Sequence, residues 1–399
     1  MVSRMKPMNL SRFLVVLAAG VLMVSCGSKA QPPLSQLDTP EHHTFTGIRL
    51  LNQEKFADAG REFELALRLD PRYARAHAGA GLVKACQGDF TGGLESLKQA
   101  ENQTRNDQEK IFVLVGFIRV NTLSHSVCLR IGTECGPDDA WLISSKDAFD
   151  RAVLIDPKAA SAHYFMGEAY LAALDLDRSG RMFSRVLDIN GDFIKEADDR
   201  WKLVQKIQRA MPGTATGKKI ALVERITRAD AAALFLEELK IDALYAGQTP
   251  KTFDTALKDR EKTKPIAAGR TGAADIGGHP LREYIERMIR IGMRGLDVYP
   301  DGNFRPDGLV DRASYAMMIE DILVKVTGNN ALSTRFIGRS SPFPDLRADF
   351  PYFNAVMVAT SRGLMEVRDI TSGEFAPYAP IAGADALLVI RKMREELRY

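Results

Sequence analysis

Two arginines stand where a short polar segment leads into an apolar, helix-like run. Arg228 follows Thr227, and Arg312 follows Asp311. Thr227 and Asp311 are suitable helix N-caps, because their side chains accept hydrogen bonds from free backbone N–H groups. A guanidinium fixed at a helix start can hold a carboxylate through two parallel hydrogen bonds. The alternative is that both arginines only cap helices or form ion pairs inside the fold.

No pattern in the chain indicates catalysis, so we expect a protein that is not an enzyme and has no cofactor or metal. There is no Gly-x-Ser-x-Gly motif and no glycine-rich phosphate loop. The paired carboxylates Asp198 and Asp199 lie on a charged, helix-like segment and indicate solvated surface. The histidines fall in no metal-ligand pattern; they are His42, His43, His77, His125, His163 and His279.

Length and composition indicate an ordinary globular protein. The chain has 399 residues, enough for two or three domains with a sizeable core. Apolar residues make up 45% and charged residues 26% of the chain. The formal net charge is only +3, so we expect no nucleic-acid partner.

Residues 1–25 have the pattern of a signal peptide. Basic residues precede an apolar run from Phe13 to Val24, which is short for a membrane span. The segment from Met23 to Cys26 resembles a bacterial lipobox, in which Cys26 would be lipidated and become the mature N-terminus. Since Gly27 follows, the resemblance implies an outer membrane lipoprotein facing the periplasm, with residues 26–39 as a lipidated tether. The alternative is an ordinary cleaved signal.

The remaining cysteines are expected to meet an oxidising compartment. Cys128 and Cys135 lie in one loop-like stretch and could close a small disulfide loop. With His125 they could instead hold a metal, although their spacing matches no common zinc pattern. Cys86 lies on an apolar helical face, which predicts a buried thiol.

Similar residues recur 34 positions apart in the first half of the chain. Gly47 and Gly81 have this separation, and so do Phe149 and Phe183. The period resembles that of tetratricopeptide (TPR) repeats, which implies a solenoid of about four helix pairs and a capping helix over residues 40–210. In this arrangement a small residue in helix A, such as Gly47, lets helix B approach closely.

The TPR resemblance also implies a concave surface on which another envelope protein could dock. The positions that would face it are Arg75, Leu82, Tyr164 and Glu168. The alternative is that these residues are ordinary surface.

The second half of the chain, residues 215–399, contains three polar boxes that each precede an amphipathic helix. They begin near Glu224, Leu309 and Pro380. The second box is preceded by the segment Tyr299–Pro306, "YPDGNFRP". These residues resemble the S-layer homology (SLH) domain, with a first copy that is partial and a third that is degenerate.

The SLH resemblance implies a pseudo-threefold prism whose grooves bind cell-wall polysaccharide or peptidoglycan-linked glycan, often with a pyruvyl ketal. Carried over by position, the glycan-binding residues would be Arg228, Arg312, Asp275 and Asp345. The third box has lost its arginine, so at most two grooves should keep a full grip on an anion.

We therefore expect a mostly α fold: a TPR-like solenoid followed by an SLH-like helical module of three repeats with short extended segments. The expected function is that of a non-enzymatic envelope lipoprotein. Its partners would be a cell-wall glycan, a protein docked on the TPR repeats, and the membrane through its lipid anchor. The alternative is a scaffold for envelope assembly or polysaccharide export, in which the SLH-like module is only a protein interface.

Overall fold

The structure is a computed structural model that describes residues 30–397 except 34, 36–37, 132–138 and 247–271. The fold is mostly α, as predicted, and the described residues contain no strand beyond isolated bridges. The chain forms two compact units. Unit 1 runs to Ala173 and includes Arg181–Ile194, whereas unit 2 comprises Leu174–Gly180 and the residues from Lys195 onwards.

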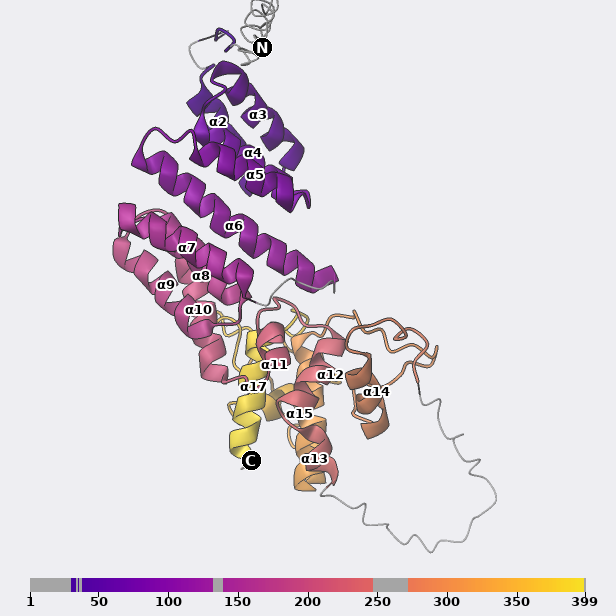
Figure 1. Ribbon diagram of the computed structural model, residues 1–399. Helices are drawn as coiled ribbons and strands as arrows, with labels where there is room; N and C mark the ends of the chain where they lie inside the picture. The colour runs from indigo at the N-terminus through magenta and orange to yellow at the C-terminus, as the bar shows by residue number, and fades with distance from the viewer. Residues whose placement is uncertain (1–29, 34, 36–37, 132–138, 247–271, 398–399) are drawn as a thin grey trace, which may run out of the picture. The chain divides into compact units, whose positions relative to one another are not determined.

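Unit 1 is a solenoid of stacked helix pairs (Figure 1). Helices α2, α4, α6 and α8 pack on one another in succession, and each of the first three also packs against the helix that follows it. The helices are α2 (Pro40–Asn52), α3 (Phe56–Leu69), α4 (Ala74–Cys86), α5 (Phe90–Glu101), α6 (Asp107–Ile131), α7 (Ala140–Ile155), α8 (Ala160–Ala172) and α9 (Leu176–Ile189). The first residues of α9 belong to unit 2.

Close approach within the helix pairs depends on glycine. A Cβ atom at Gly47 would lie 2.7 Å from the ring of Phe63, and one at Gly167 would lie 2.7 Å from the ring of Phe183. Both phenylalanines are fully buried. The expected role of the helix A glycines is therefore confirmed at these two positions, because a side chain there would force the helices apart.

Helix α6 differs from the prediction. The stretch around Cys128 was expected to be a loop, but α6 continues without a break to Ile131. No glycine or proline interrupts the sequence between Gly116 and Gly132, so nothing in it stops the helix earlier.

Part of α6, Asp107–Cys128, is the one helix in the described residues that is long and apolar enough to cross a membrane. Core helices of soluble proteins pass the same test. Val113, Leu114 and Ile118 are fully buried among the other helices of unit 1. These contacts make α6 a central helix of the solenoid.

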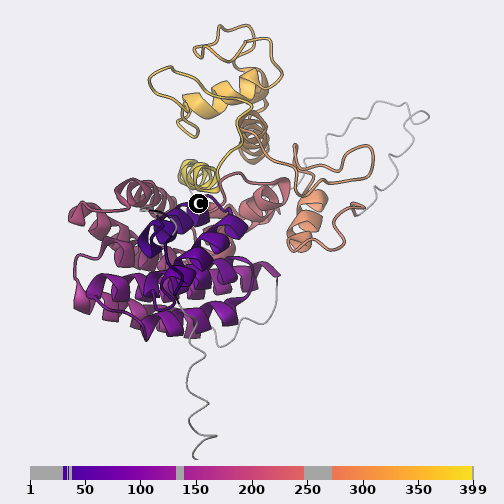
Figure 2. The ribbon, with the colours of Figure 1, turned by 90° about the horizontal axis from the view of Figure 1, so that it is seen from above.

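Unit 2 holds shorter helices joined by extended segments. Seen from above in Figure 2, the α14 and α16 segments, in orange and light orange, extend in different directions. The elements are α10 (Ile194–Ala210), α11 (Ala215–Ala221), α12 (Arg228–Glu237), α13 (Ile241–Ala246), α14 (Arg282–Ile291), α15 (Arg312–Thr327), the 3₁₀ helix η1 (Asn330–Thr334), α16 (Phe353–Ser361) and α17 (Gly383–Glu396).

The three polar boxes close a ring of backbone hydrogen bonds in unit 2. The N–H of Ile226 donates to Ile381, that of Val310 to Ile226, and that of Ile381 to Val310, each at 3.0 Å. Helices α12, α15 and α17 begin two residues after the ring positions. The boxes therefore occupy equivalent places around a pseudo-threefold axis.

Two of the three helix starts carry the predicted N-caps. The Thr227 hydroxyl accepts from the N–H of Asp230, whose carboxylate accepts in return from Thr227, which completes a capping box. Asp311 accepts from the N–H of Ser314 at 2.7 Å. Ala382, at the third position, makes no side-chain cap.

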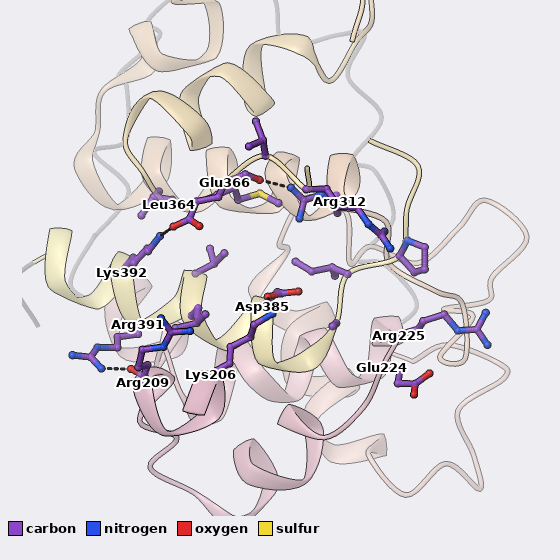
Figure 3. Close-up of a pocket in the computed structure, with 18 of the residues that line it drawn as sticks. Lys206, Arg209, Glu224, Arg225, Arg312, Leu364, Glu366, Asp385, Arg391 and Lys392 are labelled. Atoms are coloured by element: carbon purple, nitrogen blue, oxygen red, sulfur yellow. Dashed lines mark hydrogen bonds and ion pairs between the residues drawn. The ribbon is translucent and has the colours of Figure 1, made fainter. Parts of the chain in front are cut away.

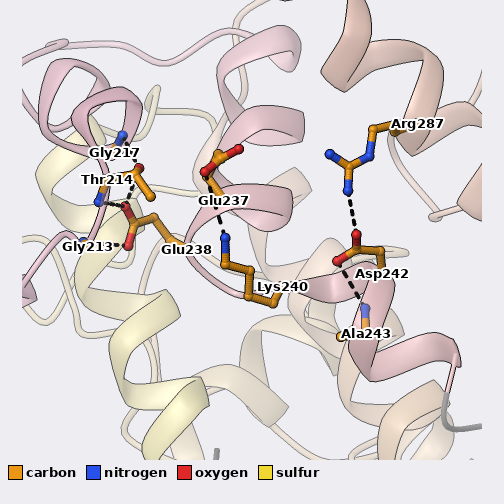
Figure 4. Close-up of polar contacts among 9 residues, drawn as sticks. All are labelled: Gly213, Thr214, Gly217, Glu237, Glu238, Lys240, Asp242, Ala243 and Arg287. Carbon is orange, nitrogen blue, oxygen red and sulfur yellow. Dashed lines mark hydrogen bonds and ion pairs between the residues drawn. The ribbon is translucent and has the colours of Figure 1, made fainter.

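A buried glutamate fixes the segment between α10 and α11. Glu238 is 5% exposed and accepts hydrogen bonds from the N–H groups of Gly213 and Thr214 and from the Thr214 hydroxyl, at 2.8–3.0 Å (Figure 4). A Cβ at Gly217 would lie 2.0 Å from the Glu238 carboxylate, so only glycine fits beside it. The turn that the sequence marks as a boundary is thus anchored to α12.

Candidate functional site

The guanidinium of Arg228 is enclosed by backbone carbonyls of the second SLH-like copy. Its Nε donates to Phe304 at 2.8 Å. Nη1 donates to Gly295 at 2.5 Å, and Nη2 to Asp297 at 2.8 Å. The group also lies over the rings of Tyr299 and Phe304, with its Cζ atom 4.8 and 4.7 Å from the ring centres. These contacts join the first copy to the second. Because Arg228 is only 8% exposed, it presents little surface to a ligand.

Arg312 makes contacts of the same kind one copy later, with two carbonyls and one ring. Its Nε donates to Phe375 at 2.8 Å, and its Nη2 donates to Glu366 at 2.5 Å. The guanidinium lies 4.6 Å from the ring centre of Phe375, and the side chain is 9% exposed. Burial lowers the pKa of both arginines from the ordinary value. Neither arginine forms an ion pair among the described residues. The alternative of ion pairs inside the fold is therefore replaced by hydrogen bonds to backbone carbonyls.

The third copy has glycine where the first two have arginine. Gly383 occupies the position equivalent to Arg228 and Arg312, at the start of α17. A Cβ atom there would lie 1.7 Å from the carbonyl oxygen of Ile220, which is in α11. The arginine is therefore absent because the backbone of α11 fills its place.

Asp275 shapes the backbone beside Arg228. Its carboxylate accepts from the N–H groups of Phe304 at 2.8 Å and Arg305 at 2.7 Å. Burial raises the pKa of Asp275, but these two hydrogen bonds outweigh it and hold the pKa below its ordinary value. Arg305 has a φ of 57°, so the carboxylate also fixes a residue in a left-handed conformation.

Asp345 repeats this arrangement in the third copy. It accepts from the N–H groups of Phe375 at 2.9 Å and Ala376 at 2.6 Å, and Ala376 has a φ of 56°. Both loop aspartates that the resemblance assigns to glycan binding therefore use their carboxylates to hold the Phe-x-Pro turn, whose phenylalanine carbonyl accepts from the arginine Nε.

A pocket of about 980 Å³ opens in unit 2 beside Arg312 and α17 (Figure 3). In Figure 3, Lys206 and Arg209 of α10 lie on one side of it, and Arg312 with Glu366 lies on the opposite side. The pocket carries more positive than negative side chains. The basic residues are Lys206, Arg209, Arg225, Arg312, Arg368, Arg391 and Lys392, and the acidic residues are Glu224, Glu366, Asp385 and Glu395.

Three of the pocket arginines have no internal partner. Arg209, Arg225 and Arg368 are exposed, and within the described part of the chain no side-chain hydrogen bond or ion pair engages them. The other cations are neutralised in part: Lys206 pairs with Asp385 at 2.8 Å. The pocket lining therefore includes three arginines whose guanidinium groups are available to an anion, and in Figure 3 the Arg225 side chain points away from Lys206 and Arg209.

Lys392 pairs with Glu366 at 2.7 Å, and the same glutamate supplies the backbone carbonyl that accepts from Arg312. The Lys392 contact lowers the pKa of Glu366, which therefore stays ionised. Of the four acidic side chains that an anion would meet here, Glu366, Asp385 and Glu395 are each already paired with a cation.

Of the residues predicted for the TPR surface, three are half-buried and one is in the core. Arg75, Tyr164 and Glu168 are half-buried. Leu82 is 4% exposed and packs in the hydrophobic core of unit 1. A leucine in that core gives a ligand no accessible side chain.

The predicted lipidation site, Cys26, and the proposed disulfide partner, Cys135, lie outside the described residues. Cys128 is disulfide-bonded, and its pairing with Cys135 stays a prediction. Cys86 is a free, half-buried thiol whose pKa is raised by burial. Among the described residues, no group of three or more His, Cys, Asp or Glu side chains is placed to hold a metal ion.

The S-layer homology domain matches residues 296–316. This segment carries the Tyr299 turn, Phe304 and Arg312. Such domains typically bind cell-wall polysaccharides, so the match associates the chain with the cell envelope and suggests glycan binding. No curated protein matches the chain.

Sequence reasoning did not identify the three available arginines. Arg209 lies in the last turn of the helix that was expected to cap the solenoid, and Arg225 lies at the start of the first box. Arg368 lies in the third copy, where the SLH pattern is degenerate. A search of every arginine in each box would have found Arg225; the other two become its neighbours only through the fold.

Proposed function

We propose that the protein is a non-enzymatic component of the cell envelope that binds an acidic cell-wall glycan in the pocket of unit 2. The observation that carries the proposal is the S-layer homology match at residues 296–316, within which Arg312 lines this pocket. The three available arginines support it, since a guanidinium binds a carboxylate with charge-assisted hydrogen bonds.

The roles proposed for the arginines differ from those that the resemblance implies. Arg228 and Arg312 hold neighbouring copies together, and Arg312 orders the backbone beside the pocket through Glu366. Arg209, Arg225 and Arg368 supply the contacts to the acidic groups of the glycan. Carboxylate substituents such as a pyruvyl ketal are suitable ligands for this set, because they are compact anions that accept two parallel hydrogen bonds.

The second part of the proposal concerns position in the cell. Lipidation at Cys26 would attach the N-terminus to the outer membrane, with the rest of the chain in the periplasm. Unit 1 would dock a further envelope protein. A chain attached at two places keeps each binding site at a high effective concentration, so that each single contact can be weak.

Co-sedimentation with purified peptidoglycan sacculi, with their attached glycan retained, tests the glycan site. The full-length chain is compared with the triple variant Arg209→Gln, Arg225→Gln, Arg368→Gln. A matched control carries Arg290→Gln, Arg335→Gln and Arg339→Gln, which removes the same charge from exposed positions of unit 2 outside the pocket. We expect the parent and the control to sediment and the pocket variant to remain mostly in solution, with unchanged thermal melting for all three.

The alternative function is a scaffold in which unit 2 is only a protein interface. One observation favours it: the guanidinium groups of Arg228 and Arg312 are largely occupied by backbone carbonyls. If the parent chain does not sediment with sacculi, or if the pocket variant sediments equally well, the glycan proposal is wrong and the scaffold is favoured.

A further inference from the structure

Two arginines of unit 1 lie on aromatic rings of the next helix in the α4, α6, α8 series. The Cζ atom of Arg75, on α4, is 4.9 Å from the ring centre of Phe112 on α6. The Cζ atom of Arg119, on α6, is 4.6 Å from the ring centre of Phe165 on α8. The same arrangement thus occurs twice, between α4 and α6 and between α6 and α8.

Neither guanidinium has a neutralising partner. Among the described residues, no hydrogen bond or ion pair engages the side chain of Arg75 or Arg119, and the Nε of Arg75 is buried without an acceptor. The neighbours that favour the charge of Arg119 are the Cys86 thiol and the Tyr164 hydroxyl, and neither is a carboxylate. Desolvation lowers the pKa of Arg119.

An unpaired, half-buried charge costs stability, and a stacked ring recovers only part of that cost. The two arginines therefore make poor structural residues. An anion placed against them would supply the missing acceptors, at sites where water is already partly excluded and hydrogen bonds to charged groups are strong.

Further aromatic rings lie beside Phe165, on which Arg119 stacks. Tyr164 and Phe165 contact Phe193, with ring centres 4.9 and 5.5 Å apart. Phe112 and Arg119 are two helical turns apart on α6, which separates the two cation sites by roughly 10 Å along the helix. A ligand that meets both must extend over this distance, as a peptide segment does and a single small anion does not.

We propose that this face of unit 1, which we call the arginine–aromatic face, binds an extended segment of a partner protein carrying at least two Asp or Glu side chains. The acidic side chains pair with Arg75 and Arg119, and intervening apolar side chains contact the rings. Charge complementarity selects the partner. The inference rests on the proposed docking role of unit 1, and it names the chemistry of the partner.

The test is selection of a random twelve-residue peptide library, displayed on phage, against the full-length chain. The selected peptides are then measured by fluorescence anisotropy against the parent, Arg75→Gln, Arg119→Gln and the control Arg68→Gln, an exposed arginine on α3. We expect enrichment of peptides with two or more acidic residues. Each of the two site variants should weaken binding at least about tenfold, since each removes a charge-assisted hydrogen bond.

Copies of the selected peptides with Asn and Gln in place of Asp and Glu should lose binding, and Arg68→Gln should not change it. A thermal melt of Arg119→Gln at or above that of the parent separates loss of a ligand contact from loss of folding. The inference is wrong if selection yields no binder, if the binders lack acidic residues, or if the site variants bind them as the parent does.

The result is independent of the glycan proposal. Arg75→Gln and Arg119→Gln leave the pocket of unit 2 intact, so both variants should sediment with sacculi whenever the parent does. Peptide binding without sedimentation would refute the glycan site alone. Sedimentation that is lost in Arg119→Gln would instead assign this face to the glycan and overturn the peptide proposal.

Discussion

Replacement of Arg228 by alanine should destabilise unit 2 whether or not a glycan is present. The change removes three hydrogen bonds, at 2.5–2.8 Å, and leaves three backbone carbonyls without their donor. A hydrogen bond to a charged group contributes about 1.5–3 kcal/mol, and a buried acceptor left without its donor costs about 1–3 kcal/mol. We therefore expect a loss of about 4 kcal/mol in the free energy of unfolding of unit 2.

For a unit of this size, a loss of that magnitude lowers the melting temperature by roughly 10 °C, at about 2–4 °C for each kcal/mol. Differential scanning calorimetry of the full-length chain measures it. The matched control is Arg225→Ala, three residues earlier, where the side chain is exposed and has no partner in the described part of the chain. It should shift the transition by no more than about 2 °C.

The reasoning fails if Arg228→Ala melts with the parent. In that case the carbonyl contacts would contribute little, and the arginine would again be a candidate ligand contact. If the prediction is right, a sacculus assay that relies on Arg228→Ala measures unfolding and not recognition. For this reason the pocket test uses the exposed arginines.

Three further changes test the surrounding structure. Asp275→Asn should weaken the dependence of the free energy of unfolding on acidic pH. The folded-state pKa of Asp275 is lowered, so its contribution to stability is present above the ordinary value of 3.8 and is lost as the pH falls below it. Urea unfolding of parent and variant between pH 3 and 6 measures the difference. Restoring the missing arginine as Gly383→Arg should prevent folding of unit 2, because the new side chain meets Ile220; a soluble variant with parental melting would contradict this. Glu238→Ala should lower stability by about 2–4 kcal/mol, since it leaves the N–H groups of the Gly213–Thr214 turn unpaired, and unchanged urea unfolding would exclude that role.

Local sequence signals predicted the local structure well. Thr227 and Asp311 are N-caps because their side chains reach N–H groups only three residues away. The 34-residue spacing marked Gly47 as a position of close helix approach, and the structure places Phe63 of the following helix against it. The solenoid and the three boxes could be predicted because each rests on a local pattern that recurs along the sequence.

What could not be predicted depends on contacts between distant segments. The arginine of a box is a suitable carboxylate ligand by its chemistry, but Arg228 is 67–76 residues from its carbonyl acceptors, and only the fold brings them together. The absence of an arginine at position 383 follows from α11, a short helix that no pattern placed there. Arg209, Arg225 and Arg368 come from three separate segments, so no single motif contains them.

The ring formed by Ile226, Val310 and Ile381 has a consequence for biosynthesis. Its members are spread from Ile226 to Ile381, so the ring cannot close until the polypeptide is available as far as Ile381. The contacts in unit 1 are mostly between helices adjacent in sequence and can form as soon as each pair emerges. Maturation should therefore proceed in two stages, with the first half compact while the second still awaits its final strand-like segment. Chains that stop short of Ile381 should be degraded rather than accumulate.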